Sequence, residues 1–271
     1  ASLWNQAIEW GVSLYATSVF WESGNVLWLA GLSSHAPGDP AQLADAGPMG
    51  AVRIVFDAQG SVADARHFVS RIRPDLNDGR VVEGLPSGEV MQVQNLPDGR
   101  ILLVCAAERM LPDGSDMALR PFFRDGDGNM RPGGLAAVDP ETLAMEILSD
   151  PQELPDPQAA ALLPDGRLLV LDASNGAHVL ENGTWKPWEG VLPAGFPRAL
   201  HPWRDGAAVL TDAAARVPGL ADEIPGSFFC AAEVGEILYL GHAQGIVGIA
   251  PAGAAVSLPP YPDPAPIPFT P

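Results

Sequence analysis

The stretch GRLLVLDA, residues 166–173, combines a turn glycine, one spacer residue and a run of apolar residues. The same outline returns as GNVLWL from Gly24, GRILLV from Gly99, GAAVLT from Gly206 and GEILYL from Gly235. These glycines belong to turns such as SG, PDG and RDG, which favour positive φ in a β-hairpin. A strand-like segment also precedes each turn, so the sequence predicts five units that each open with a β-hairpin.

The second strand of each predicted hairpin is apolar at consecutive positions rather than at alternate ones. Consecutive apolar residues indicate a strand with both faces buried, whereas a two-layer sandwich would expose one face and produce alternation. Several small antiparallel sheets packed face to face around an axis satisfy this pattern.

The fold prediction is therefore all-β: a five-bladed β-propeller. We expect a short or irregular fourth blade, because only ARVPGL (215–220) separates its hairpin from the next one. A six-bladed arrangement stays open if the interval between Gly24 and Gly99 contains a further unit. We expect one propeller domain over residues 1–258 and a proline-rich C-terminal tail over 259–271.

The formal net charge of −18 argues against nucleic acid as a partner, because such proteins need clustered Lys and Arg to neutralise phosphates. No apolar run approaches the ~18–20 residues of a membrane span, so membrane insertion is not expected. These residues contain no basic flank followed by a long apolar stretch, so we expect no signal peptide in them, and the compartment and oligomeric state stay undetermined. Cys105 and Cys230 both lie in apolar segments and are predicted to be buried free thiols.

Two segments carry a resemblance to known propellers: VMQVQNLPDGRILLVC, residues 90–105, and PQAAALLPDGRLLVLDASNGAHVLENG, residues 157–183. They resemble blades of the gluconolactonase and SMP-30-like propellers and of the NHL-type propellers, which use such a hairpin as the inner pair of each blade. For the lactonase family this resemblance implies a divalent metal held by Glu, Asn and Asp at the starts of inner strands.

The positions where that resemblance places metal ligands lie eight residues before each turn glycine. They are occupied by Ala16, Met91, Gln158, Arg198 and Ser227. Hard cations prefer several convergent oxygen ligands, which this set does not supply. A metal-dependent lactonase or related hydrolase therefore stays open only as an alternative, with the register shifted by one or two residues.

Ligand-binding residues are predicted on two strands. Arg198, His201 and Trp203, on the predicted inner strand RALHPW, could bind an anionic or sugar-like ligand by charge, hydrogen bonding and stacking. Trp185 and Trp188, in the predicted outer strand GTWKPWEG, could stack on a glycan or a protein partner. Packing between blades is the alternative role for both groups.

The stretch RDGDGNMRPGG, residues 124–134, places Asp125, Asp127 and Asn129 at alternate positions, as at the start of a calcium loop. The twelfth position is Ala136, where an EF-hand needs a bidentate Glu, so the stretch is not an EF-hand. A weak Ca²⁺ site and a plain Asp/Gly turn both stay open, and no other cofactor is expected.

These observations favour a non-enzymatic recognition or assembly module that binds a protein or glycan, such as a subunit of a larger bacterial or phage-like particle or surface complex. No catalytic residues are assigned. The alternatives are the metal-dependent lactonase and a five-bladed glycosidase, which would need a pair of carboxylates that no motif in this sequence singles out.

Overall fold

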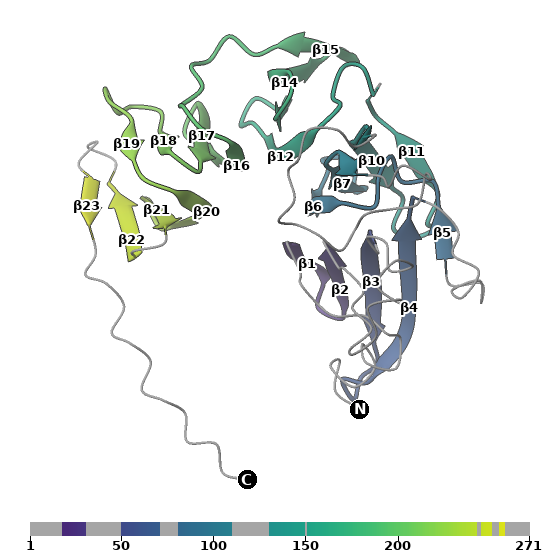
Figure 1. Ribbon diagram of the computed structural model, residues 1–271. Coiled ribbons are helices and arrows are strands. Elements are labelled where there is room, and N and C mark those ends of the chain that lie inside the picture. Colours follow the sequence, from purple (N-terminus) through teal and green to yellow (C-terminus); the bar gives the residue numbers. More distant parts are fainter. Residues whose placement is uncertain are drawn as a thin grey trace, which may run out of the picture. The chain divides into compact units, whose positions relative to one another are not determined.

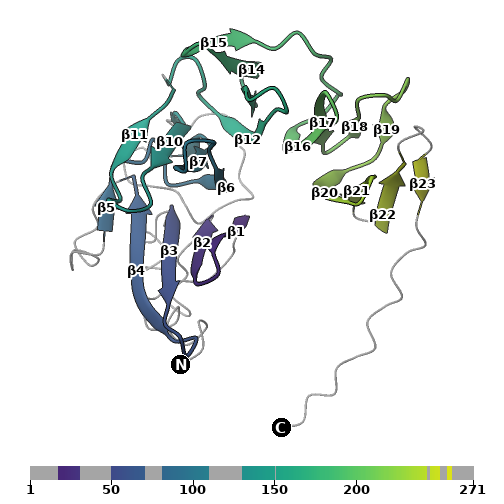
Figure 2. The same cartoon turned by 180° about the vertical axis from the view of Figure 1, so that it is seen from behind.

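A computed structural model of the chain describes residues 18–30, 50–70, 81–109, 130–149, 151–242, 245–250 and 255–257. Within these ranges the regular elements are all β-strands, which confirms the all-β prediction (Figures 1 and 2). No helix long and apolar enough to span a membrane occurs in this part of the chain.

The first sheet has five strands in sequence order. They are β1 (Ser18–Ser23), β2 (Val26–Ala30), β3 (Ala51–Phe56), β4 (Val62–Val69) and β5 (Val81–Glu83). Neighbouring strands are antiparallel except that β5 runs parallel to β4. The strand β5 was not expected from the sequence.

Four further sheets have four strands each, and a separate ribbon has two. The second sheet contains β6 (Val90–Asn95), β7 (Ile101–Cys105), β10 (Gly134–Val138) and β11 (Met145–Ile147); the ribbon pairs β8 (Glu108–Arg109) with β9 (Met130–Arg131). The third contains β12 (Pro157–Leu162), β13 (Leu168–Asp172), β14 (Gly176–Glu181) and β15 (Thr184–Pro187).

The fourth sheet contains β16 (Pro197–Trp203), β17 (Gly206–Thr211), β18 (Ala214–Arg216) and β19 (Ile224–Pro225). The fifth contains β20 (Phe228–Val234), β21 (Ile237–His242), β22 (Gly245–Ile249) and β23 (Ala255–Ser257). The first two strands of all five sheets form the five predicted hairpins, and the short β18 and β19 give the fourth sheet its expected irregularity.

The hairpin turns use positive φ as predicted at Gly99 (89°), Gly166 (85°) and Gly235 (63°). The prediction is wrong at Gly24 and at Gly206, neither of which takes a positive φ. Because Trp203 pairs with Gly206, the two-residue loop is Arg204–Asp205 and ends before the glycine, and Arg204 takes the left-handed conformation with φ 54°. Left-handed backbone is rare for a residue with a Cβ, so this turn carries local strain.

Burial of both faces holds for four of the five second strands. Every residue of β2, β7 and β13 is buried, and so are all residues of β17 after the first. In β21, by contrast, buried residues alternate with half-buried ones. The prediction that both faces are buried is therefore wrong for the fifth sheet.

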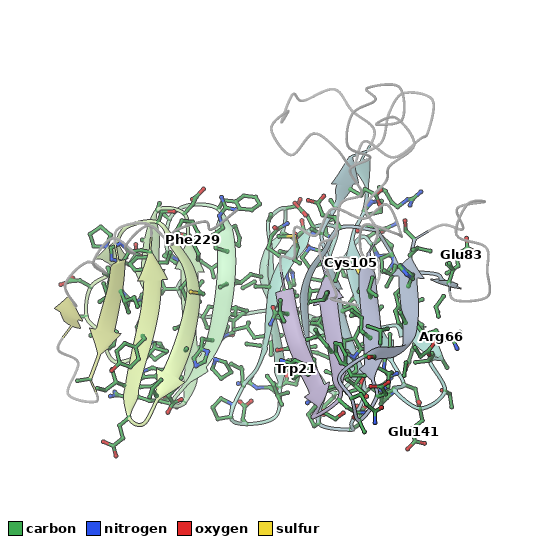
Figure 3. All side chains as sticks on the ribbon, turned by 90° about the horizontal axis from the view of Figure 1, so that it is seen from below. Trp21, Arg66, Glu83, Cys105, Glu141 and Phe229 are labelled. Atoms are coloured by element: carbon green, nitrogen blue, oxygen red, sulfur yellow. The ribbon has the colours of Figure 1, made fainter. Side chains whose placement is uncertain are left out.

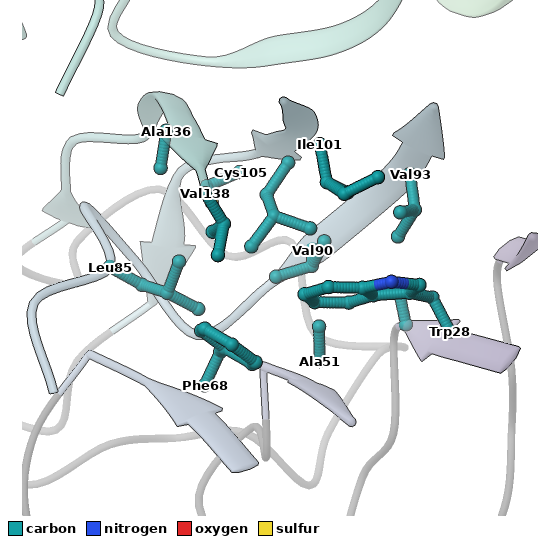
Figure 4. Packing of buried hydrophobic residues seen from close by; sticks show 12 residues of the cluster. Trp28, Ala51, Phe68, Leu85, Val90, Val93, Ile101, Cys105, Ala136 and Val138 are labelled. Atoms are coloured by element: carbon teal, nitrogen blue, oxygen red, sulfur yellow. The ribbon is translucent and has the colours of Figure 1, made fainter. Parts of the chain in front are cut away.

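Neighbouring sheets pack face to face through apolar clusters. In the first cluster, Trp28 and Phe68 of the first sheet, with ring centroids 4.9 Å apart, pack with Val93 and Ile101 of the second sheet (Figure 4). A separate cluster joins the fourth and fifth sheets and includes Trp203, Leu210, Phe228, Leu238 and Leu240. Burying apolar area of this kind is the main stabilising contribution to the fold.

Side chains on the inner strands also bond to the backbone of the neighbouring sheet. The amide of Val93 donates to Ser18 Oγ at 3.1 Å, which joins β6 to β1. Gln92 spans from β6 to β12: its Nε2 donates to the carbonyl oxygen of Ala160 at 2.9 Å, and its Oε1 accepts from the amide of Ala160 at 2.8 Å. We call this pair of hydrogen bonds the Gln92 clamp.

The two cysteines differ in environment. Cys105 is fully buried in the first cluster (Figure 3), and this burial raises the pKa of its thiol to about 12. Cys230 is exposed on β20, so the prediction of a buried thiol is wrong at that position. The reason is that Cys230 lies on the face of the fifth sheet opposite the one that packs against the fourth sheet.

The chain divides into two compact units: Ala1–Ala160 with Asp172–Gly176, and Ala161–Leu171 with Ala177–Pro271. The boundary between them falls within the third sheet. The predicted extent of a single domain over residues 1–258, followed by a tail, stays a prediction.

Candidate functional site

The first predicted ligand-binding group lies on β16, and its three members occupy different environments. Trp203 is only 4% exposed and belongs to the apolar cluster between the fourth and fifth sheets. Arg198 is exposed near the start of the strand, 5.3 Å above the ring of Phe196 and 3.9 Å from a carboxylate oxygen of Asp212. Trp203 therefore packs between the two sheets, whereas Arg198 is exposed, so the two residues lie in different environments.

His201 is half-buried on the same strand. Burial lowers the pKa of its imidazole, and the carboxylate of Glu233 partly opposes this effect. Residues two positions apart in a strand share a face, so His201 lies on the face of Trp203, which packs against the fifth sheet. This position suits a neutral imidazole within the sheet interface better than a ligand-binding group.

The second predicted group lies at the outer edge of the third sheet. Trp185 lies on β15, opposite Leu180 of β14, and is half-buried. Trp188 follows β15 directly and is also half-buried, with its backbone amide donating to the carbonyl of Ala177 at 2.9 Å. Both tryptophans therefore keep part of their rings in solvent while their backbone is tied to the sheet.

Two strongly exposed apolar residues follow these tryptophans. Val191 is 62% exposed and Leu192 is 39% exposed. The ring of Trp188 covers Gly190 so closely that a Cβ there would lie 2.2 Å from it, which holds the ring in place. We call Trp185, Trp188, Val191 and Leu192 the 185–192 surface; the part contributed by Val191 and Leu192 was not expected from the sequence.

The predicted calcium ligands Asp125, Asp127 and Asn129 lie outside the described residues, so their arrangement stays a prediction. Within the residues that the structure does describe, no three His, Cys, Asp or Glu side chains gather closely enough to hold a metal ion. Of the positions where the lactonase resemblance places ligands, Gln158 is buried and donates to Asp156 Oδ1 at 2.6 Å.

A polar network that sequence reasoning missed surrounds Glu108 at the end of the second sheet. Glu108 is buried, and its Oε2 accepts from the amide of Gly88 at 2.8 Å and lies 3.7 Å from Arg131 Nη1. Arg131 also donates to Ser70 Oγ at 2.9 Å. The only signal in the sequence is a charged residue soon after five consecutive apolar positions. The network fixes the β8–β9 ribbon to both neighbouring sheets.

A second network surrounds Asp172 at the end of β13. Its carboxylate accepts from the amides of Asp156, Ser174 and Asn175 at 2.7–2.8 Å. Asp156 in turn accepts from the amide of Ala107 at 2.8 Å. These carboxylates are occupied by backbone donors, and the contacts satisfy turns that would otherwise leave amides unpaired.

Comparison with known proteins defines the fold. The sequence matches no protein family and no curated protein sequence. Streptogramin B lyase is similar in structure, with a TM-score of 0.52 and 12% identity over 94% of this chain and 70% of the lyase. The chain has the β-propeller fold.

Two further structures share this propeller fold. Virginiamycin B lyase from Staphylococcus aureus gives a TM-score of 0.50 and 12% identity over 92% of this chain and 85% of its own. The extracellular domain of a hybrid two-component system from B. thetaiotaomicron gives a TM-score of 0.55 and 13% identity over 90% of this chain. This chain matches 31% of the length of that extracellular chain. The resemblance seen in residues 90–105 and 157–183 is thus confirmed for the fold, while the number of blades stays a prediction.

Proposed function

We propose that this propeller is a recognition module that binds a protein or glycan partner through the 185–192 surface, within a larger assembly. The observation that carries the proposal is that four large apolar side chains reach solvent within eight residues at the edge of one sheet. Apolar groups gathered on a surface in this way are typical of interaction sites.

The chemistry of the 185–192 surface suits binding rather than reaction. Partly exposed tryptophans supply large contact area and can stack on sugar rings or fill a pocket on a protein. The backbone contact of Trp188 with Ala177 and the packing of its ring over Gly190 hold the surface ready before binding. Such preorganisation reduces the entropy lost when a complex forms.

Two acids near strand ends, Glu22 and Asp172, support this proposal because they have structural partners. Glu22 accepts from Trp28 Nε1 at 2.7 Å and from two nitrogens of Arg53 at 2.8 and 2.9 Å. Asp172 is occupied by three backbone amides. A glycosidase needs one carboxyl to protonate a leaving group and another to act as base or nucleophile, and neither residue is placed for that work.

The proposal is tested by capture from native extract with a tagged chain. We expect the Trp185→Ala/Trp188→Ala double variant to retain less than about a tenth of the wild-type capture, because buried tryptophans at an interface each contribute about 2 kcal/mol or more. The matched control is Trp21→Ala, since Trp21 is 55% exposed but lies on β1. A glycan array with the same three proteins separates a sugar from a protein partner.

Equal capture by the double variant and the wild type would remove the 185–192 surface from the proposal. Thermal unfolding of both proteins shows whether the double variant stays folded. Elemental analysis with a thermal-shift screen against Ca²⁺ and Zn²⁺ tests the lactonase alternative separately: a bound metal that raises the unfolding temperature would favour that alternative over recognition.

A further inference from the structure

One face of the fifth sheet is apolar and open. The other face belongs to the cluster shared with the fourth sheet, through Phe228, Leu238, Leu240 and Ile249. Because side chains alternate along a strand, the residues between them point the opposite way. We call them the open face: Cys230, Ala232, Val234, Ile237, Tyr239 and Ile246.

The open face is exposed and carries no charged side chain. Val234 is 66% exposed and Ile246 is 36% exposed, and the neighbouring Phe229, at the β20 irregularity, is 53% exposed (Figure 3). In a chain with a formal charge of −18, an uncharged apolar face of this size indicates a covering partner.

Two glycines make the open face flat. The Sγ of Cys230 lies 2.6 Å from where a Cβ on Gly241 would be, and the ring of Tyr239 lies 3.4 Å from where a Cβ on Gly248 would be. The side chains of Cys230 and Tyr239 therefore lie over the glycines of the neighbouring strands and do not project outward from the sheet. A flat apolar surface of this kind suits a long, narrow occupant that makes contact along its length.

A segment with matching chemistry follows the outer strand of this same sheet. Residues 258–271, LPPYPDPAPIPFTP, come directly after β23 and contain a single charged residue, Asp263. Proline occupies every second position from 260 to 268, and proline has no N–H with which to join a sheet edge. This segment can therefore bind a sheet through its side chains and rings but not as an additional strand.

We propose that residues 258–271 dock on the open face of the fifth sheet. As a polyproline II helix this segment would reach about 40 Å, whereas four strands span only about 15 Å across the sheet. The segment is therefore long enough to cross the face from β23 to β20. Its apolar residues Tyr261, Ile267 and Phe269 would cover Val234, Ile246 and the region around Cys230.

The test uses Cys230 as a reporter of whether the face is covered. The rate of alkylation by N-ethylmaleimide at pH 7 is measured for the full chain and for a chain that ends at Pro260. We expect Cys230 to react about tenfold more slowly in the full chain, as for a docked state populated about ten times more than the undocked one. Cys105 should stay unreactive in both proteins because it is fully buried.

A full-length variant keeps the test independent of truncation. Val234→Asp places a charge on the open face and should raise the rate at Cys230 to that of the truncated chain. The matched control is Ile147→Asp, because Ile147 is also an exposed apolar residue (47%) but lies on β11 of the second sheet. The control should leave the rate of the full chain unchanged.

Three results would overturn the proposal. The first is equal reactivity of Cys230 in the full and truncated chains. The second is protection that persists after truncation, which would assign the cover to another part of the chain. The third is protection that grows with protein concentration in both proteins, which would assign the cover to a second copy.

Discussion

Replacing Gln92 by methionine should weaken the contact between the inner strands of the second and third sheets. Methionine keeps the length and flexibility of the glutamine side chain but can make neither bond of the Gln92 clamp. The change therefore leaves both the amide and the carbonyl of Ala160 without their side-chain partner.

The size of the effect follows from the burial of Ala160, which is only 1% exposed. Water cannot easily replace the lost partner there, and a buried polar group left unsatisfied costs about 1–3 kcal/mol. With two such groups, we expect Gln92→Met to lower the free energy of unfolding by about 3 kcal/mol. The rotamer freedom and apolar area of methionine offset part of the loss.

Gln94→Met supplies the control on the same strand. Gln94 only accepts a bond from Gln92 Nε2 at 3.2 Å, and its own buried Nε2 has no hydrogen-bond partner among the described residues. This variant should change the free energy of unfolding by less than about 1 kcal/mol. The contrast between the two glutamines isolates the Gln92 clamp from the general effect of removing an amide.

Urea unfolding followed by circular dichroism gives the free energy of unfolding of both variants. The slope of this free energy against urea concentration is compared first, to detect any change in cooperativity. Hydrogen exchange of a peptide covering 157–163 gives a local reading, because the Ala160 amide should exchange faster only in Gln92→Met. Equal stability of the two variants, or unchanged exchange at Ala160, would refute the clamp as a stabilising contact.

Three further predictions concern pH, backbone strain and thiol reactivity. Burial raises the pKa of Glu22, but hydrogen bonds, chiefly from Arg53, outweigh it and hold the pKa below its ordinary value; the stability this pair adds is therefore present at neutral pH and lost as the pH falls through the lowered pKa. In urea unfolding at pH 7, the free energy of unfolding of the wild type should exceed that of Glu22→Gln by about 2 kcal/mol. This difference should shrink as the pH falls, and a difference that stays constant down to pH 3 would contradict the predicted direction. Gly99→Ala should lose about 1 kcal/mol because φ is 89°, whereas Gly24→Ala, equally open but outside the left-handed region, should be neutral or slightly stabilising; equal losses would show that φ is not the cause. In a thiol assay, Cys105 should react only in denaturant, since burial raises its pKa to about 12, and rapid labelling of the native protein at Cys105 would contradict its placement in the core.

The hairpins could be predicted from the sequence because their causes are local. A turn glycine fixes where a strand must end, and consecutive apolar residues show that neither face of the next strand suits water. Both signals lie within about ten residues of Gly99 and Gly166, where the prediction is most accurate. At Gly206 the same signal predicted positive φ at the wrong residue. The strand register pairs Gly206 with Trp203 and leaves Arg204 in the turn with positive φ.

Other features could not be predicted because they depend on which segments meet in space. Gln92 and Ala160 are 68 positions apart, and the sequence around neither residue indicates that they bond to each other. The environments of Trp203 and Trp188 differ for the same reason: both are aromatic residues at strand ends, but only Trp203 faces a neighbouring sheet. Apolar sequence in β20 and β21 indicates faces that avoid water, but it does not identify what covers them.

The central claim is that the 185–192 surface contacts a partner, and a footprint of the native complex tests it most directly. The chain is isolated with its bound partner and oxidised by hydroxyl radicals, in parallel with the free chain. We expect oxidation of Trp185 and Trp188 to fall on binding while that of the exposed Trp21 stays unchanged. Unchanged oxidation of both edge tryptophans, with protection elsewhere, would contradict the claim.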